Sequence, residues 1–353
     1  MANAATIYFL DVGQGTSQVI LFEDSSLVIL DCGRSAVTLL ELLNTISFDR
    51  IKALILSHLH DDHIGGAPAV FDSFVDRIDH VYVPQDRPAE GVLANAVITK
   101  IRDMSENESI FTINFLVRSG PVHGKLHPPL ADASRATLSV VYPTAIQSLE
   151  VQTQKDVNQG SGILVIECGG SRVLFPGDAG HLAFNALKDR LGHGNRLRCD
   201  VFAAPHHGGK LSNRAVTIPG QSDVFGWLYS EIVGSNVTIF SVGSSNSHGH
   251  PLESHITAAR ESGSHVLCTQ MTDRCHSSLS AIAPALLQPI SRPSTCIRSG
   301  VGCAGTIVVN VNESDVRVHR FTEHQDLVND LALSQSPLCR PGTSTSGTTG
   351  TTT

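Results

Sequence analysis

Short runs of β-branched and other apolar residues recur along most of the chain, and this recurrence narrows the fold more than any other feature. The runs are bounded by Gly, Asp, Asn or Pro, as buried strands usually are. They fall at residues 6–10, 18–22, 27–31, 53–57, 81–83, 138–142, 162–167, 173–176, 201–205, 237–242, 266–268, 306–311 and 316–319. The early strands form a meander and the later ones are interleaved with helices, so we predict an α/β layered sandwich.

Helical periodicity appears in five stretches, at residues 36–46, 90–104, 181–191, 223–233 and 252–262. The stretch 86–135 is the most irregular and is a candidate insertion. From about Ser334 the chain becomes rich in Ser, Thr and Gly without apolar periodicity. We therefore predict one domain at residues 1–333 and a disordered tail at 334–353.

Composition excludes several classes of protein. The chain has 353 residues, and its 41% hydrophobic and 16% charged residues predict a globular protein. The formal net charge of -8 argues against a protein that coats nucleic acid non-specifically, although a local basic groove stays open. No apolar run reaches the roughly 18 residues of a membrane helix, and the first residues lack the features of a signal peptide. We expect a cytoplasmic protein without a membrane partner.

The strongest chemical signal is SHLHDDHIGG at residues 57–66, which follows the apolar strand IKALIL. His58 and His60 point to the same side if the strand geometry continues. Asp62 and His63 then belong to the following turn and can face a second ion. Neutral imidazole and carboxylate suit zinc, and also manganese or iron. The alternative is a polar loop with scattered histidines.

Two further strand ends carry metal-ligand chemistry. Asp178 follows the strand at 173–176, and its carboxylate can bridge two cations; alternatively it caps the next helix. His206 and His207 follow the strand at 201–205. Adjacent side chains diverge, so one imidazole is expected to bind an ion while the other meets substrate or a supporting carboxylate. The alternative for this pair is a surface turn.

A fourth strand end, SVGSSNSHGHP at residues 241–251, carries His248 and His250. Phosphate contact or proton donation would be a functional role for these imidazoles. The alternative is that either one caps the entry to the next helix.

The order HxHxDH, Gly-Asp, His-His-Gly resembles the metallo-β-lactamase superfamily, and more narrowly the soluble hydrolase domain of the ComEC competence-protein family. The narrower resemblance rests on four segments: DVGQG at 11–15, DCG at 31–33, NQGS at 158–161 and the Gly-to-Pro element at 243–251. It runs from about residue 6 to 311. It implies an αββα four-layer sandwich with two divalent metal ions, zinc or manganese, at one edge of the sheets.

The resemblance also implies a ligand set. The ligands would be His58, His60, Asp62, His63, Asp178 and one of His206 and His207. Many members of the superfamily have another ligand histidine before the bridging Asp. The segment 158–161 lies where that histidine is expected, so one ion would be held less fully by the protein or completed by water.

These residues define a hydrolytic mechanism without a Ser or Cys nucleophile. Metal binding lowers the pKa of water to roughly 7 and so provides hydroxide at neutral pH. Asp62 is expected to orient the nucleophile, and His207, His206 or His250 to protonate the leaving oxygen.

We predict phosphodiester hydrolysis of a nucleic acid or a nucleotide, because the resemblance coincides with a basic stretch around the His-His pair. That stretch contains Lys188, Arg190, Arg196, Arg198, Lys210 and Arg214, with Asp189 and Asp200 as its acidic residues. It fits a phosphate-bearing substrate, or else it is an ordinary solvated surface. Two alternatives stay open: hydrolysis of a lactone, thioester or β-lactam, and a non-catalytic metal-binding scaffold.

The chain has eight cysteines, four of which lie between residues 268 and 303. Cys268, Cys275, Cys296 and Cys303, or three of them with His276, are candidate ligands of a structural zinc ion. The alternative is buried free thiols that pack as small apolar groups. Cys339 lies in the predicted tail and is expected to be exposed.

Overall fold

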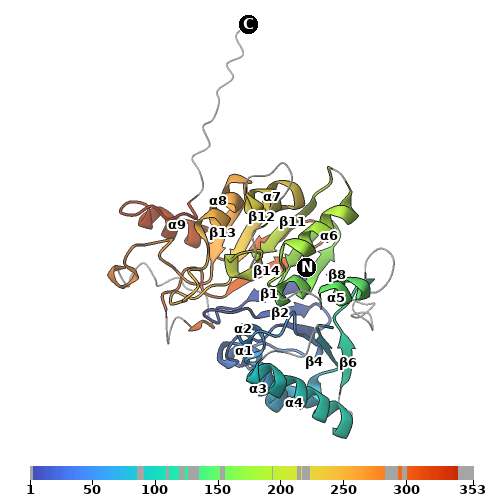
Figure 1. Ribbon diagram of the computed structural model, residues 1–353. Coiled ribbons are helices and arrows are strands. Elements are labelled where there is room, and N and C mark those ends of the chain that lie inside the picture. Colours follow the sequence, from blue (N-terminus) through green and yellow to red (C-terminus); the bar gives the residue numbers. More distant parts are fainter. Residues whose placement is uncertain are drawn as a thin grey trace.

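The structure is a computed structural model that describes residues 3–85, 91–108, 111–118, 124–125, 135–151, 156–192, 194–212, 216, 223–282, 293–295 and 300–340. Two sheets pack against each other through an apolar core, and helices cover the outer face of each sheet (Figure 1). This arrangement confirms the predicted αββα four-layer sandwich.

The first sheet has the strand order β15-β14-β1-β2-β3-β4-β5-β6. Its strands are β1 (Ala5–Phe9), β2 (Gln18–Phe22), β3 (Ser26–Leu30), β4 (Arg50–Ile55), β5 (His80–Val83), β6 (Thr112–Phe115), β14 (Ile307–Val311) and β15 (Val316–Val318). Pairing is antiparallel from β15 to β3 and parallel from β3 to β6. The residues that follow β3 and β4 therefore emerge at the same edge of the sheet.

The second sheet has the order β13-β12-β11-β10-β9-β8-β7. Its strands are β7 (Gly124–Lys125), β8 (Thr137–Tyr142), β9 (Ile163–Cys168), β10 (Ser171–Phe175), β11 (Leu197–Ala203), β12 (Val233–Phe240) and β13 (His265–Cys268). Strands β10 to β13 pair in parallel. Their carboxyl ends thus share one edge as well.

The helices divide between the two outer faces (Figure 1). Helices α1 (Val37–Leu43), α2 (Asp61–Ile64), α3 (Ala67–Phe74) and α4 (Val92–Glu108) belong to the first half. Helices α5 (Ala145–Val151), α6 (His181–Leu191), α7 (Val224–Trp227), α8 (Glu253–Glu261) and α9 (Phe321–Leu331) belong to the second. Short helical turns lie at η1 (Val75–Arg77), η2 (Val157–Gly160), η3 (Pro205–Gly208), η4 (Leu228–Ile232) and η5 (Leu279–Ala281).

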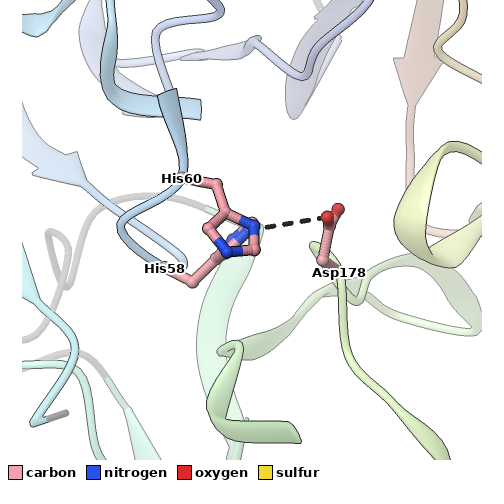
Figure 2. A group of neighbouring side chains, drawn as sticks. All are labelled: His58, His60 and Asp178. Carbon is pink, nitrogen blue, oxygen red and sulfur yellow. Dashed lines mark ion pairs between the residues drawn. The ribbon is translucent and has the colours of Figure 1, made fainter. Parts of the chain in front are cut away.

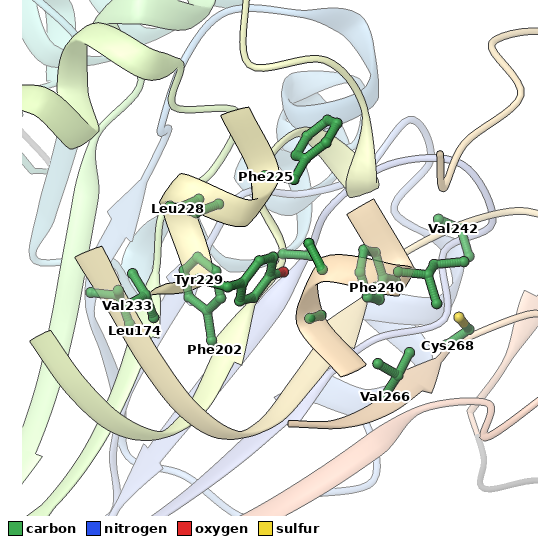
Figure 3. Packing of buried hydrophobic residues seen from close by; sticks show 14 of the residues in the cluster. Leu174, Phe202, Phe225, Leu228, Tyr229, Val233, Phe240, Val242, Val266 and Cys268 are labelled. Atoms are coloured by element: carbon green, nitrogen blue, oxygen red, sulfur yellow. The ribbon is translucent and has the colours of Figure 1, made fainter. Parts of the chain in front are cut away.

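Apolar side chains form three cores that follow these layers. The core between the sheets includes Phe9 of β1 and Phe175 of β10, whose rings stack with centroids 5.7 Å apart. A second core joins the first sheet to α1, α3 and α4. The third joins the outer face of the second sheet to α6, α7, α8 and α9, and part of it is drawn in Figure 3. The inner core fixes the two sheets relative to each other.

The elements agree with the sequence predictions in most places. Each predicted strand overlaps a strand, and each helical pattern overlaps a helix; the one at 223–233 is split between α7 and the π-helical turn η4. Helices α2, α3, α5 and α9 and strands β6 and β7 were not predicted. The candidate insertion at 86–135 contains α4 and β6, and β6 pairs with β5 at the sheet edge. Apart from the start of the tail, the domain limits stay a prediction.

The start of the predicted tail needs correction. Residues 334–340 are described, and the backbone N–H of Leu338 donates to the carbonyl of Arg274 at 3.1 Å. Cys339 is buried, not exposed, because it joins the core beneath α8 and α9. The rest of the tail lies outside the described residues.

Among the described residues no helix is long and apolar enough to span a membrane.

Replacing Phe9 with Ala should lower the free energy of unfolding by about 3–5 kcal/mol, because it opens a cavity between the sheets. Urea titration followed by circular dichroism measures the loss. The matched control is Phe115→Ala in β6, where the side chain is 58% exposed and the change should be small. Equal losses in both variants would contradict the assigned core.

Candidate metal centre

The predicted ligands converge where the carboxyl ends of the parallel strands of both sheets meet. His58 follows β4 and Asp178 follows β10, so each sheet contributes from a strand end. His206 and His207 lie on η3, directly after β11. Asp62 and His63 lie on α2, the turn of helix that begins at Asp61. The site is therefore built by the edge that the parallel strands share.

His58, His60 and Asp178 form one group whose ligand atoms all lie within 4.8 Å of one another. Figure 2 shows the two imidazoles on one side and the Asp178 carboxylate facing them from the other half of the molecule. The Nε2 atom of His58 is buried and has no hydrogen-bond partner. A buried ring nitrogen without a hydrogen-bond partner destabilises the folded protein unless it binds another group, such as a metal ion.

Asp62, His63 and His207 form a second group with the same mutual spacing. The Nε2 atom of His207 lies 3.2 Å from Oδ2 of Asp62 and 3.3 Å from Nε2 of His63. Three donors of the kind that zinc and manganese accept thus point at one place.

The carboxylate of Asp178 lies between the two groups. Its Oδ1 is 3.0 Å from Nε2 of His63 and 3.5 Å from Nε2 of His207. Its Oδ2 is 3.5 Å from Nε2 of His58 and 3.7 Å from Nε2 of His206. One oxygen faces each group, which is the geometry of a bridging ligand.

The second ring nitrogens identify which atoms are free to bind ions. The Nδ1 of His207 lies 3.1 Å from the carbonyl of Ser241, and the Nδ1 of His206 lies 2.7 Å from the carbonyl of Lys210. A carbonyl only accepts, so each Nδ1 carries the proton and each Nε2 presents a lone pair. This orientation is typical of metal-binding histidines. The residues present therefore fit a pair of divalent cations.

The carboxylates of the site also create a negative potential that favours positive charge. Burial opposes the charge of His63, but Asp178 and Asp31 raise its pKa well above the usual value. Burial likewise opposes the charge of Asp178, but His63, His207 and His58 hold its pKa well below the usual range. Burial, and then His63, lowers the pKa of His58 to about 4, so this imidazole is neutral and can bind a metal at pH 7.

The backbone at residues 206 and 207 explains how adjacent histidines reach different places. Both residues adopt left-handed conformations, with φ of 52° and 55°. Such conformations cost about 1–3 kcal/mol each and cluster at functional sites. His207 joins the second group, whereas His206 faces Oδ2 of Asp178, with Nδ2 of Asn158 3.4 Å from its Nε2. Asn158 belongs to the segment where a ligand histidine was expected.

Asp31 is the main supporting residue whose role sequence reasoning missed. Its carboxylate accepts from the backbone N–H and the hydroxyl of Ser57, at 2.7 and 2.6 Å, and lies 2.7 Å from Nδ1 of His63. The sequence offered it only as part of the DCG turn. Ser161 is a second such residue, since its hydroxyl accepts from the backbone N–H of Asp178 at 3.0 Å.

A cavity of about 830 Å³ opens over the centre. Its walls include the apolar side chains of Leu59, Val92 and Leu93, together with the exposed guanidinium of Arg34. Val92 and Leu93 bring the start of α4 to the mouth of the site. A substrate would therefore meet an apolar wall, one arginine and the metal-binding edge.

His248 and His250 also line this cavity. The ring of His250 lies 5.2 Å from that of His206, measured between centroids. Burial, and then His206, lowers the pKa of His250 to about 4. Its position beside the centre is compatible with the expected catalytic role, but at this pKa the imidazole is neutral at pH 7. The role stays a prediction.

Most of the basic residues expected around the His-His pair do not line the cavity over the metal centre. Lys188 pairs with Glu231, and Arg190 donates to the carbonyl of Val141. Arg196 and Arg198 lie at the start of β11, and its seven residues carry the chain roughly 20 Å to the catalytic edge.

Two members of that basic stretch remain. The backbone carbonyl of Lys210 contacts Nδ1 of His206, and Arg214 lies outside the described residues. Among the residues that the structure describes, Arg34 is the arginine or lysine that lines the cavity.

Removing the carboxylate of Asp178 should weaken both ion sites, because each of its oxygens faces a different group. Asp178→Ala should therefore lose metal from both, whereas His60→Ala should weaken only the first. Metal content per chain, measured by mass spectrometry after dialysis, checks this. Equal losses in the two variants would contradict the bridging role.

Replacing Asp31 with Asn should weaken metal binding about 10–100-fold, the usual cost of losing a support for a ligand histidine. Competition with a chromophoric chelator gives the affinity. Asp61→Asn is the matched control, since Asp61 is exposed and lies outside both groups. An unchanged affinity in Asp31→Asn would refute the supporting role.

Comparison with known proteins adds the family context. A model of the metallo-beta-lactamase superfamily matches residues 10–219. A stretch of 69 residues is 36% identical to a ribonuclease Z from Treponema denticola, and it covers 19% of this chain and 22% of that protein. The match thus spans about a fifth of that relative.

Two solved structures found by comparison share little sequence with the chain. Zn(2+)-bound PqqB from Methylobacterium extorquens is 10% identical over 74% of this chain and 97% of its own, with a TM-score of 0.43. The short form of human tRNase Z is 16% identical over 56% of this chain and 77% of its own, with a TM-score of 0.36.

Proposed function

The chain belongs to the metallo-beta-lactamase superfamily, and from this membership we propose that it is a metal-dependent phosphodiesterase acting on a nucleic acid or a nucleotide. As a member of the superfamily with His and Asp metal-binding groups it is a metallohydrolase. The narrower likeness to ComEC-type hydrolase domains, the choice of zinc or manganese, and a cytoplasmic location are part of the proposal.

The observation that carries the proposal is the Asp178 carboxylate between two ligand groups. A pair of divalent ions bound there would supply hydroxide at neutral pH and stabilise charge on a phosphoryl group. Asp62 borders the second group, where it can orient the attacking oxygen. His250, at the cavity wall beside His206, is our candidate for protonating the leaving oxygen. Its pKa of about 4 leaves it neutral at pH 7, so this role requires the negative charge of a bound phosphate to raise that pKa.

Arg34 supports a phosphate-bearing substrate. A guanidinium presents a planar set of donors that matches phosphate oxygens. Arg34 projects from the turn that follows Asp31, and it lines the same cavity as the metal groups. A substrate phosphate at the metal edge would therefore lie within the field of a permanent positive charge.

The short match to ribonuclease Z also favours a phosphodiester over other bonds. By its name that relative is a ribonuclease, so its substrate is joined by phosphodiester linkages. The match covers a small part of both proteins, so the kind of nucleic acid or nucleotide is left to experiment.

Turnover of bis-p-nitrophenyl phosphate should be measured beside a lactone panel, each with zinc and with manganese. We expect metal-dependent cleavage of the phosphodiester and none in Asp178→Ala. Turnover of lactones alone would contradict the proposal. A metal-loaded protein that cleaves no phosphodiester or lactone would instead be a binding scaffold.

Arg34→Ala should raise the KM for the phosphodiester about tenfold or more, since a hydrogen bond to a charged group contributes about 1.5–3 kcal/mol. Metal content should stay unchanged. Arg50→Ala is the control, because Arg50 pairs with Asp79 away from the cavity. An unchanged KM in Arg34→Ala would show that Arg34 does not bind the substrate phosphate.

A further inference from the structure

We propose that the chain holds a second, structural zinc site, formed by Cys268, Cys275, Cys303 and Cys339. All four residues belong to the core on the outer face of the second sheet. Figure 3 shows Cys268 in this core beside Val266 and Val242. None of them lines the catalytic cavity, so this site is independent of the proposed function.

Backbone hydrogen bonds bring the first two cysteines together. Cys268 is the last residue of β13, and its carbonyl accepts from the N–H of Ala304 at 3.0 Å. The N–H of Cys303 in turn donates to the carbonyl of Thr269 at 3.1 Å. Two distant parts of the chain thus run side by side at these residues.

The other two cysteines are brought together in the same way. Cys275 closes a turn in which its N–H donates to the carbonyl of Thr272 at 2.9 Å. Residues 334–340 return to this turn, where the N–H of Leu338 donates to the carbonyl of Arg274 at 3.1 Å. Cys339 is therefore placed next to Cys275.

The four thiols are removed from water and lie in one apolar core. Their exposed fractions lie between 2% and 7%. The side chains of Cys275 and Cys339 are joined by a hydrogen bond. The short stretch from Cys268 to Cys275 connects this pair to the backbone contacts between Thr269 and Cys303.

His324 of α9 adds a polar contact to the cluster. Its Nε2 lies 3.2 Å from Sγ of Cys303. This buried hydrogen bond fixes the position of the Cys303 thiol from the side of α9.

The chemistry of the set fits zinc. Structural zinc ions take four ligands in a closed shell, and four cysteines form one of the common sets. Binding would replace four thiol protons, which pass to solvent, with one cation. No three of these sulfur atoms lie within the 4.8 Å spacing of the catalytic groups, so binding requires rotations about the Cα–Cβ bonds.

The surrounding fold explains what such an ion would do. The long connection between β13 and β14 contains, among its described residues, only the short turn η5 as a helix or strand. Long connections without regular structure are uncommon unless something holds them. A zinc ion would fasten this connection and residues 334–340 to the end of β13.

The membership differs from the set expected from the sequence. Cys339 replaces Cys296, which lies outside the described residues. Cys339 was expected to be exposed, and its burial beside Cys275 makes it a ligand candidate.

Zinc content of the full chain tests the proposal. The Cys275→Ser/Cys339→Ser double variant should contain one zinc ion fewer per chain than the wild type. The control is Cys168→Ser, a buried cysteine of the inter-sheet core, which should match the wild type. Asp178→Ala should lose the catalytic ions and keep the structural one. Equal zinc in the double variant and the wild type would overturn the proposal.

A second measurement uses the wild type and does not depend on the folding of a variant. Cobalt-loaded protein should show the intense visible absorption of a tetrahedral cobalt thiolate. Titration with an organomercurial should release one metal ion as four thiols react. Release without thiol consumption, absence of the thiolate absorption, or a Cys275–Cys339 disulfide in the freshly purified protein would each refute a zinc thiolate site.

Discussion

The buried carboxylate of Asp178 is the contact on which the site depends, because it faces imidazoles that come from both halves of the chain. Its two oxygens meet His63 and His207 on one side and His58 and His206 on the other. A carboxylate this deep is stable only when positive charge or donors compensate it. The ionised form of Asp178, the neutral His58 and the negative potential that Asp178 and Asp31 create at His63 therefore form one interdependent set.

The fold supplies this set through the direction of its strands. Parallel pairing from β3 to β6 and from β10 to β13 sends the ends of both sheets to one edge. The inter-sheet core, with the stacked rings of Phe9 and Phe175, fixes how those edges meet. Packing in the middle of the molecule thus determines the distances between ligands at its edge.

Much of the site was predictable from the sequence because its ligands follow recognisable strand ends. The pattern at residues 57–66 is contiguous, and Asp178 follows a clear apolar run. The separate roles of His206 and His207 depend on left-handed backbone, which the sequence pattern does not encode. The prediction of a basic rim failed because Arg196 and Arg198 lie at the end of β11 that is far from the site. The burial of Cys339 was not predicted because the tail is rich in Ser, Thr and Gly.

The turn from Asp31 to Arg34 joins two tasks within four residues. At one end Asp31 orients His63, and at the other Arg34 reaches the cavity. Substitutions at this turn that change substrate preference would therefore be constrained. A substitution that shifts the backbone to suit a new substrate also disturbs the imidazole of His63. New specificity is easier to acquire at Val92 and Leu93, which line the same cavity and belong to neither metal-binding group.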